Sequence, residues 1–183
     1  GEGRYSHGRL HFSRHRLMAQ KKKSTARTTQ RHRALDVVFE ADEKGVVGEG
    51  PLLDLLFDRQ RVSTAQVPIG EFGSEIVTAY AQNWDNIDSM VEAASEDWAL
   101  SRMNVVDRTI LRLGTTEIMV MGTPRALVVA EWSALARELS TERSIGFVMG
   151  VLNKVADIRE REIGSVDADT DDETTAHEGT DLA

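Results

Sequence analysis

The chain has 183 residues, of which 40% are apolar, and a formal net charge of −8, which suits one packed domain with terminal extensions. It contains no cysteine, so disulfide frameworks, thiolate metal sites and cysteine-based catalysis are excluded. No run of about 18 apolar residues occurs, and no apolar segment follows the first positive charges. The sequence therefore predicts neither a membrane span nor a secretory signal, and we expect a cytoplasmic protein.

The charges are unevenly distributed along the chain. Residues 1–33 hold ten of the 22 Lys and Arg residues and four of the five His residues, with Glu2 as their one acid. Residues 164–183 hold seven acids and no Lys or Arg. We therefore expect a disordered basic arm over residues 1–25, a helical domain over residues 26–162 and a disordered acidic tail over residues 163–183.

The first predicted helix runs from about Ala26 to Glu43, and its two halves differ. The N-terminal half is polar and basic, whereas the C-terminal half carries an apolar face with Leu35, Val38 and Phe39. The basic half should therefore project from a helix that is anchored at its other end. Stacked cations destabilise an isolated helix slightly, and a partner with phosphate groups would turn this cost into attraction. A solvated basic helix end without a partner is the alternative.

Apolar residues at three- and four-residue spacing predict six further helices: Pro51–Gln60, Glu71–Trp84, Asp85–Ala94, Asn104–Met121, Pro124–Leu139 and Ser140–Ile158. The helix that Asn104 caps has the widest apolar face, and we expect it to form the central strut of the core. Thr123 is the expected cap of the helix that Pro124 opens. No segment alternates apolar and polar residues, so the predicted fold is all-α, a bundle of about seven helices.

The sequence offers no constellation of catalytic residues. The five histidines lie in the arm, in the basic half of the first helix or in the tail: His7, His11, His15, His32 and His177. None can be placed by the core next to a nucleophile, so pairs of the Ser-His kind have no support. We expect no enzyme activity, no cofactor and no metal site.

Three separated segments resemble the NusB family of transcription antitermination factors. The first is ARTTQRHRALDVVFEAD in the first helix, and the second is the pattern W-x-L-x-R-M-x-x-V-D-R-x-I-L-R-L-G from Trp98 onward. The third is LARELSTERSIGFVMGVLNKVADI, which follows a helix that Thr123-Pro124 opens and that contains Glu131. The similarity covers about residues 26–158, and the segments occur in the family's order.

The resemblance implies an all-helical fold of two packed helical subdomains. It also implies binding of single-stranded boxA RNA from ribosomal RNA operons, together with the small-subunit ribosomal protein NusE, in the elongating RNA polymerase complex. Some members of the family also self-associate, so a homodimer is a further expectation.

The resemblance and the charge pattern together assign two groups of site residues. The RNA-binding group consists of Lys21, Lys22, Lys23, Arg27, Arg31, His32, Arg33, Arg143 and Phe147. In this group, Arg143 stands where the family usually has an acid, and a cation there should attract phosphate. The group that contacts NusE consists of Phe39, Asp107, Arg108 and Glu131.

Several residues depart from the family pattern. Thr28 and Thr29 stand where many members have basic residues, and Met149 replaces an asparagine. Trp132 stands where a small residue is usual, which predicts either overpacking of a groove or a shift of the neighbouring helices. Two other functions therefore stay open: an accessory domain related to ribosomal RNA cytosine methyltransferases, which would need a separate catalytic part, and a helical scaffold that binds protein only.

Overall fold

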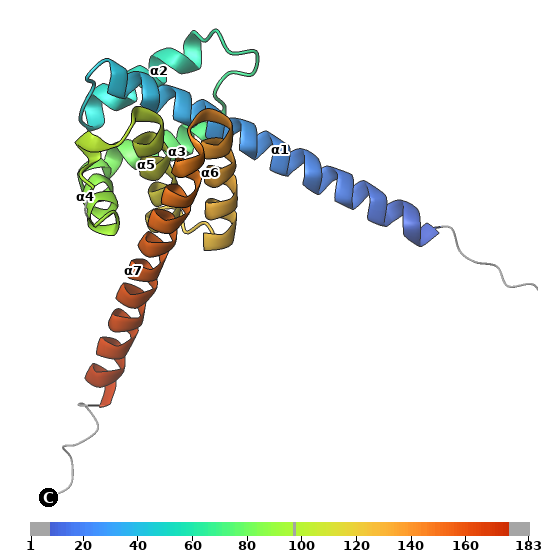
Figure 1. Ribbon diagram of the computed structural model, residues 1–183. Helices are drawn as coiled ribbons and strands as arrows, with labels where there is room; N and C mark the ends of the chain where they lie inside the picture. The colour runs from blue at the N-terminus through green and yellow to red at the C-terminus, as the bar shows by residue number, and fades with distance from the viewer. Residues whose placement is uncertain (1–7, 97, 176–183) are drawn as a thin grey trace, which may run out of the picture.

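The computed structural model describes the backbone of residues 8–96 and 98–175 and the side chains of residues 25–96 and 98–165. This part of the chain forms α-helices and one short 3-10 helix, with no strand (Figure 1). The elements are α1 (Gly8–Glu43), α2 (Glu49–Arg61), α3 (Glu71–Gln82), α4 (Trp84–Ala94), η1 (Leu100–Arg102), α5 (Val105–Met119), α6 (Arg125–Leu139) and α7 (Glu142–Thr175). The predicted all-α bundle of seven helices is confirmed.

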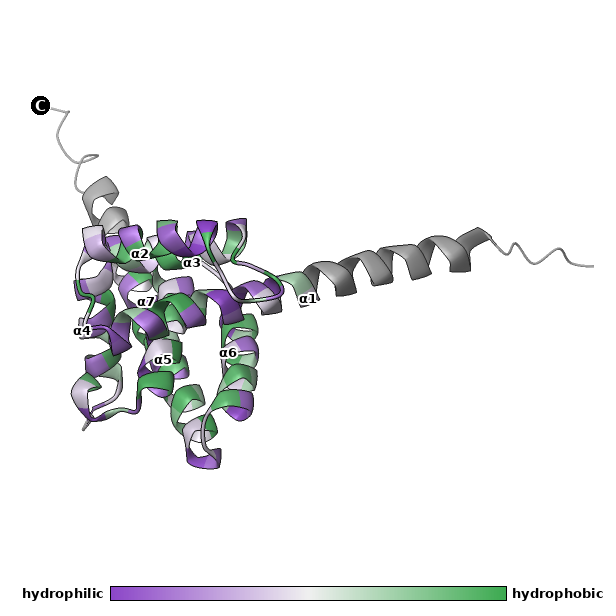
Figure 2. Cartoon of the chain, turned by 90° about the horizontal axis from the view of Figure 1, so that it is seen from above, coloured by the Kyte–Doolittle hydropathy of each residue, from purple (hydrophilic) through white to green (hydrophobic). Residues whose placement is uncertain are grey.

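The helices form two groups that share α5. Helices α1, α2 and α3 pack on one another, while α6 and α7 pack together with α4 alongside α7. Helix α5 touches α1 and α3 of the first group and α4, α6 and α7 of the second. Figure 2 shows hydrophobic and hydrophilic residues in separate patches along the helices of the bundle, as expected of amphipathic helices that meet in a shared core.

Helix α5 is the central strut that the sequence predicted. Ten of its fifteen residues are buried, and Ile110, Leu111 and Leu113 have no exposed surface. The predicted cap is also present, because the Asn104 side chain accepts a hydrogen bond of 2.8 Å from the backbone N–H of Asp107. A cap of this kind satisfies one of the free amides of the first turn. Two features of the sequence, periodicity and capping, therefore located the core helix correctly.

The two terminal helices are longer than predicted. Helix α1 begins at Gly8 instead of near Ala26, and α7 continues to Thr175. No proline or glycine interrupts α1 after Gly8, so its backbone hydrogen bonds can continue without a break. Both extensions project away from the bundle (Figure 1). Disorder was predicted for residues 1–25 and 163–183, where most side chains lie outside the described range, and it stays a prediction together with the domain limits.

The start of α6 differs from the prediction in its capping. Pro124 occupies the N-cap position, and no side chain caps the helix. The Thr123 hydroxyl, which was the expected cap, instead donates to the Glu117 carboxylate at 3.2 Å. A charged acceptor in the core makes a stronger hydrogen bond than an exposed helix terminus. The prediction that Thr123 caps α6 is therefore wrong.

An ion pair fastens α2 to α1. Arg59 donates through Nε and Nη2 to the two oxygens of Glu40, at 2.6 and 2.8 Å, and Lys44 donates to Glu40 at 2.8 Å. The hydrogen bonds from Arg59, reinforced by Lys44, lower the pKa of Glu40 from 4.5 to about 2.

Among the described residues, none of the helices is long and apolar enough to cross a lipid bilayer.

The close packing of α3 on α1 predicts the effect of a Gly73→Ala substitution. A Cβ atom at Gly73 would lie 2.9 Å from the backbone oxygen of Gln30 and 2.8 Å from Ile69. Because the Gln30 backbone cannot move without shifting α1, we expect a loss of about 1–3 kcal/mol in the free energy of unfolding, measured by urea denaturation. In the control, Gly150→Ala, the new methyl group meets no atom within 4 Å. Equal urea midpoints for the two variants would contradict this account.

The Glu40 carboxylate predicts part of the acid sensitivity of the fold. Its pKa is lowered to about 2 in the folded chain, so its contribution is present above pH 4.5 and is lost as the pH falls towards about 2. Glu40→Gln should flatten the pH dependence of the unfolding free energy in this window, measured by urea denaturation between pH 2 and pH 6. Glu138→Gln, at an exposed position, should leave the slope as it is.

Candidate nucleic-acid interface

Arg27 lies where α1 leaves the bundle, and its side chain is exposed. Its guanidinium carbon lies 4.8 Å from the centroid of the Phe72 ring. Among the residues that the structure describes, no carboxylate forms an ion pair with Arg27. An exposed guanidinium without an anionic partner can bind a phosphate group. The structure therefore leaves Arg27 accessible for the role that the sequence predicted.

Arg31, four residues further on, does not belong to the surface. It is 1% exposed, and its guanidinium donates to both oxygens of Glu117 on α5, from Nε at 2.8 Å and from Nη2 at 2.9 Å. At this position α1 already packs on α5, so the side chain points into the core. The prediction that Arg31 contacts RNA is wrong for this conformation, because its hydrogen-bonding edge is occupied by a buried carboxylate.

The Glu117 carboxylate accepts four hydrogen bonds in the core. Besides the two from Arg31, the Trp132 indole donates to Oε2 at 2.6 Å and Thr123 donates to Oε1 at 3.2 Å. These four donors fill the usual acceptor capacity of a carboxylate. Trp132 has no exposed surface, and its ring lies against α5, since a Cβ atom at Gly114 would be 3.3 Å from it. The Trp132 indole thus supplies one donor of this cluster, and the overpacking or helix shift predicted for it stays a prediction.

Glu131 completes this cluster from α6. It accepts a hydrogen bond of 2.9 Å from the Thr28 hydroxyl and lies 3.9 Å from Arg31. The side chain of Glu131 is 16% exposed, so most of it is held at the contact between α1 and α6. The predicted role of Glu131 in binding a protein partner is therefore not supported by its position.

His32 and Arg33 lie on the flank of α1 and share one carboxylate. Arg33 is 3.0 Å and His32 is 3.7 Å from Asp36. Burial raises the pKa of Asp36, while the charges of Arg33 and His32 oppose this rise. Since Asp36 neutralises part of their charge, both side chains are weaker candidates for RNA contact than Arg27. The side chains of Lys21, Lys22 and Lys23 lie outside the described residues.

A second exposed region lies at the start of α7. Arg143 is exposed, and one turn later the half-buried Phe147 faces Trp98, with ring centroids 6.5 Å apart and planes inclined by 59°. Trp98 is 53% exposed. A Cβ atom at Gly146 or Gly150 would meet no atom within 4 Å, so the surface around Phe147 is open. The sequence used Trp98 only as the first residue of a family motif and did not place it in the RNA-binding group.

The residues predicted to contact a protein partner are mostly engaged inside the fold. Asp107 is 6% exposed, and its two oxygens accept hydrogen bonds of 2.7 Å from Ser140 and Ser144. It thereby joins the first turn of α5 to the turn between α6 and α7. The prediction that Asp107 faces a partner is wrong, because its carboxylate is consumed in this turn. Phe39 is half-buried and packs against the core.

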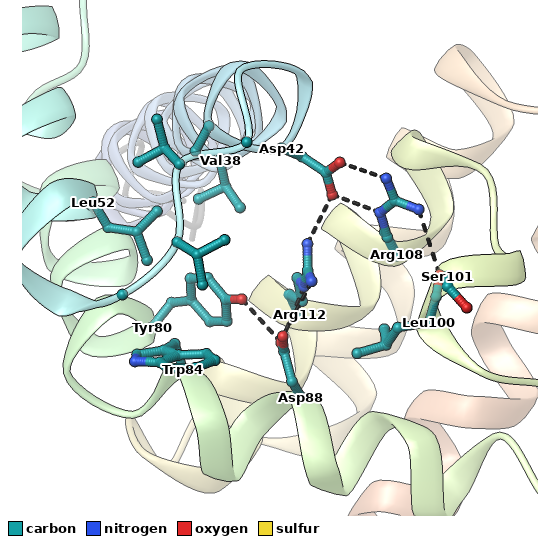
Figure 3. Close-up of a pocket in the computed structure, with 15 residues that line it drawn as sticks. Val38, Asp42, Leu52, Tyr80, Trp84, Asp88, Leu100, Ser101, Arg108 and Arg112 are labelled. Atoms are coloured by element: carbon teal, nitrogen blue, oxygen red, sulfur yellow. Dashed lines mark hydrogen bonds and ion pairs between the residues drawn. The ribbon is translucent and has the colours of Figure 1, made fainter.

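Arg108 also takes part in an internal network, which Figure 3 shows. It forms a two-pronged ion pair with Asp42 on α1. Arg112 pairs with Asp42 at 2.8 Å and with Asp88 at 3.0 Å, so it links these two carboxylates. Tyr80 donates to Asp88 at 2.9 Å. The hydrogen bond from Arg108 lowers the pKa of Asp42, and burial raises the pKa of Tyr80. Arg108 therefore mainly joins α1 to α5, and only a small part of its side chain reaches the surface.

This network forms one wall of a cavity of about 460 Å³. The opposite wall is apolar and aromatic and comes from α1, α2, α3, α4 and the turn after α1: Val38, Val46, Leu52, Tyr80 and Trp84. Every charged group in the wall has an opposite charge beside it, so the cavity holds no free acid or base for catalysis. Within the described part of the chain, no three His, Asp or Glu side chains are grouped as metal ligands.

The buried pair of Arg31 and Glu117 predicts a large loss of stability on substitution. Arg31→Met leaves the Glu117 charge in the core without its cation, so the free energy of unfolding should fall by about 3–5 kcal/mol, measured by urea denaturation. Adding Glu117→Gln should restore part of the loss, because no buried charge then remains. Arg125→Met is the control, since Arg125 pairs with Asp157 and Glu160 at the exposed surface. A midpoint for Arg31→Met equal to that of the control would refute a structural role.

Comparison with known proteins places this fold and sequence in one family. The model of the NusB family matches residues 28–157. The transcription antitermination protein NusB of Streptomyces griseus is 43% identical over 135 residues, which cover 73% of this chain and 94% of that protein. NusB of Streptomyces coelicolor is 40% identical over 138 residues, with 73% and 94% covered.

Solved structures agree with the sequence relationship. The structure of Thermotoga maritima NusB has a TM-score of 0.57 and 25% identity, and covers 72% of this chain and 90% of that one. A crystal structure of the antitermination factors NusB and NusE in complex with double-stranded RNA has a TM-score of 0.58 at 21% identity, over 72% of this chain and 96% of that one, and shares the fold. By the span of the family match and the identity to its members, the chain belongs to the NusB family.

Proposed function

We propose that this chain is a transcription antitermination factor that binds boxA-type RNA of ribosomal RNA operons together with NusE, within the elongating RNA polymerase complex in the cytoplasm. The observation that carries the proposal is the family match over residues 28–157, supported by an antitermination protein that is 43% identical to this chain. A NusB with the same fold has been crystallised with NusE and RNA.

The RNA-binding surface that we propose is smaller than the sequence suggested. It contains Arg27 at the base of the projecting part of α1, and Arg143 with Phe147 at the start of α7. Arg27 and Arg143 are exposed, and cations of this kind bind phosphates with an affinity that falls as salt is raised. Phe147, beside Trp98, can stack an unpaired base. We keep Lys21, Lys22 and Lys23 in this surface on sequence grounds, and His32 and Arg33 as secondary contacts.

For NusE, we retain Phe39 and Arg108 as proposed contacts. Phe39 is half-buried, and the Arg108 side chain is 18% exposed, so both reach the surface in part. Arg108 already pairs with Asp42, and a partner would therefore meet a neutral, ordered arginine–aspartate pair. Such a pair favours hydrogen bonding to a polar partner surface over attraction to a strongly charged one. Self-association of the chain remains a proposal of the same rank.

Two observations favour a second candidate function, a scaffold that binds protein only. The burial of Arg31 removes one of the two arginines of α1 that were assigned to RNA, and Asp36 partly neutralises Arg33. Fewer free cations mean fewer phosphates neutralised and weaker RNA binding. The two functions predict different effects of boxA RNA. If the chain recognises RNA, boxA RNA should raise its affinity for NusE; if it is a scaffold, that affinity should stay the same. For neither function do we propose an enzymatic reaction.

Charge reversal at the exposed arginines tests the proposed function. Arg27→Glu and Arg143→Glu should each weaken boxA binding by about tenfold. The slope of the logarithm of the affinity against the logarithm of the salt concentration should become less steep by about 0.7 for each phosphate that is no longer neutralised. The measurement is electrophoretic mobility of boxA RNA with NusE across a salt series. Arg125→Glu, at a surface arginine outside the proposed RNA surface, is the matched control for charge.

The outcomes separate the two candidate functions. Loss of affinity in Arg27→Glu and Arg143→Glu, with the control close to the parent chain, supports RNA recognition by this surface. Full retention of boxA binding in both variants would be evidence against it. Capture of NusE without any gain in affinity from boxA RNA would favour the scaffold. Arg31 is unsuitable as an RNA probe, because its substitution acts on the fold.

A further inference from the structure

Phe72, in the first turn of α3, lies against two arginines of α1. The guanidinium carbon of Arg27 is 4.8 Å from the ring centroid, and that of Arg31 is 5.1 Å from it. Both distances are within the range of a cation–π interaction. The two arginines have different surroundings, because Arg31 is buried against Glu117 while Arg27 is exposed. The ring therefore lies at the boundary between the polar cluster of the core and the exposed end of the bundle.

The position of Phe72 is fixed by contacts between α1 and the start of α3. The Gln30 side chain accepts a hydrogen bond of 2.6 Å from the backbone N–H of Gly70 and donates one of 3.3 Å to the oxygen of Pro68. One residue after Phe72, Gly73 lies so close to α1 that a Cβ atom would be 2.9 Å from the Gln30 oxygen. These contacts hold the ring on the same side of α1 as Arg27 and Arg31.

A guanidinium that stacks on an aromatic ring keeps its hydrogen-bonding edge available. A guanidinium meets an aromatic ring through its face, whereas its N–H groups point outward in the plane of the group. Arg27 has no ion pair among the described residues, so this edge is not occupied by a carboxylate. A long side chain that is already ordered loses less conformational freedom when it binds a ligand.

We propose that Phe72 is a positioning residue for RNA recognition, which holds the Arg27 guanidinium in an orientation that suits a phosphodiester group of single-stranded RNA. The proposal rests on the proposed function and adds to it a residue outside both predicted site groups. Gln30 acts with Phe72, because it fixes the turn that carries the ring. Arg31 shares the ring but binds Glu117, so Arg27 is the arginine of this pair that can reach RNA.

A double-mutant cycle on the full chain tests the proposal. Phe72→Leu keeps an apolar side chain and removes the aromatic face, and it should weaken boxA binding in the presence of NusE by about threefold. Phe72→Tyr keeps the face and should bind as the parent chain does. In an Arg27→Ala background, Phe72→Leu should cause no further loss, because the orientation of Arg27 is then irrelevant.

Phe57→Leu is the matched control. Arg61 lies 5.4 Å from the Phe57 ring on α2, so this substitution also removes a cation–π contact, but away from the proposed surface. It should leave boxA affinity unchanged. Thermal unfolding of each variant shows whether Phe72→Leu remains folded. The side-chain protons of Arg27 give a second measurement that needs no Phe72 variant, since the ring should shift their NMR signals upfield in the parent chain.

Each result decides one point. A threefold loss that disappears in the Arg27→Ala background, or upfield signals for Arg27 if Phe72→Leu is unfolded, supports the positioning role. Equal affinity of a folded Phe72→Leu variant and the parent chain would overturn it, as would the same loss with and without Arg27, or unshifted Arg27 signals. If the parent chain fails to bind boxA RNA at all, the proposed function fails instead, and the NMR measurement still reports on the ring and Arg27.

Discussion

The interaction on which the rest of the structure depends is the buried ion pair between Arg31 and Glu117. A carboxylate without exposed surface is stable only when its charge is compensated and its lone pairs are satisfied. Here Arg31, Trp132 and Thr123 supply the four donors, and they come from α1, from α6 and from the turn before α6. The geometry of one carboxylate on α5 thus fixes how α1 and α6 lie against the central helix.

This constraint also determines which face of α1 is available to partners. With Arg31 held in the core, the residue four positions earlier, Arg27, lies one turn further out and remains exposed. Among the side chains that the structure describes, the four basic ones of α1 therefore divide into one that stabilises the fold, two that share Asp36, and one that is open to solvent. A charge count over the first helix would treat all four as equal. Of these four, Arg27 is the one that forms no ion pair with a carboxylate among the described residues.

A second charged network, around Asp42, holds the other end of the apolar stretch of α1 against α5. Arg108 and Arg112 of α5 meet Asp42 of α1 and Asp88 of α4, so the helix is tied to the core on both sides of its apolar stretch. These pairs are only partly exposed, which makes them more resistant to screening by salt than surface pairs. The charged side chains beside the cavity already have partners of opposite charge, so this wall should change little when a partner binds.

The sequence by itself determined the helices, their order, the capped central helix and the family, because apolar periodicity, capping residues and motif order are local properties of the chain. It placed Arg27, Arg143 and Phe147 at accessible positions. The predicted contacts of Arg31 and Asp107 with partners do not fit the buried, paired side chains of the folded protein, and the sequence placed Phe72 only in the core. Their partners are far away in the chain: Arg31 and Glu117 are 86 residues apart, and Asp107 and Ser144 are 37 apart. Only the tertiary structure decided which charges were neutralised in the core and which remained exposed, since this depends on side chains that meet only after the helices have packed.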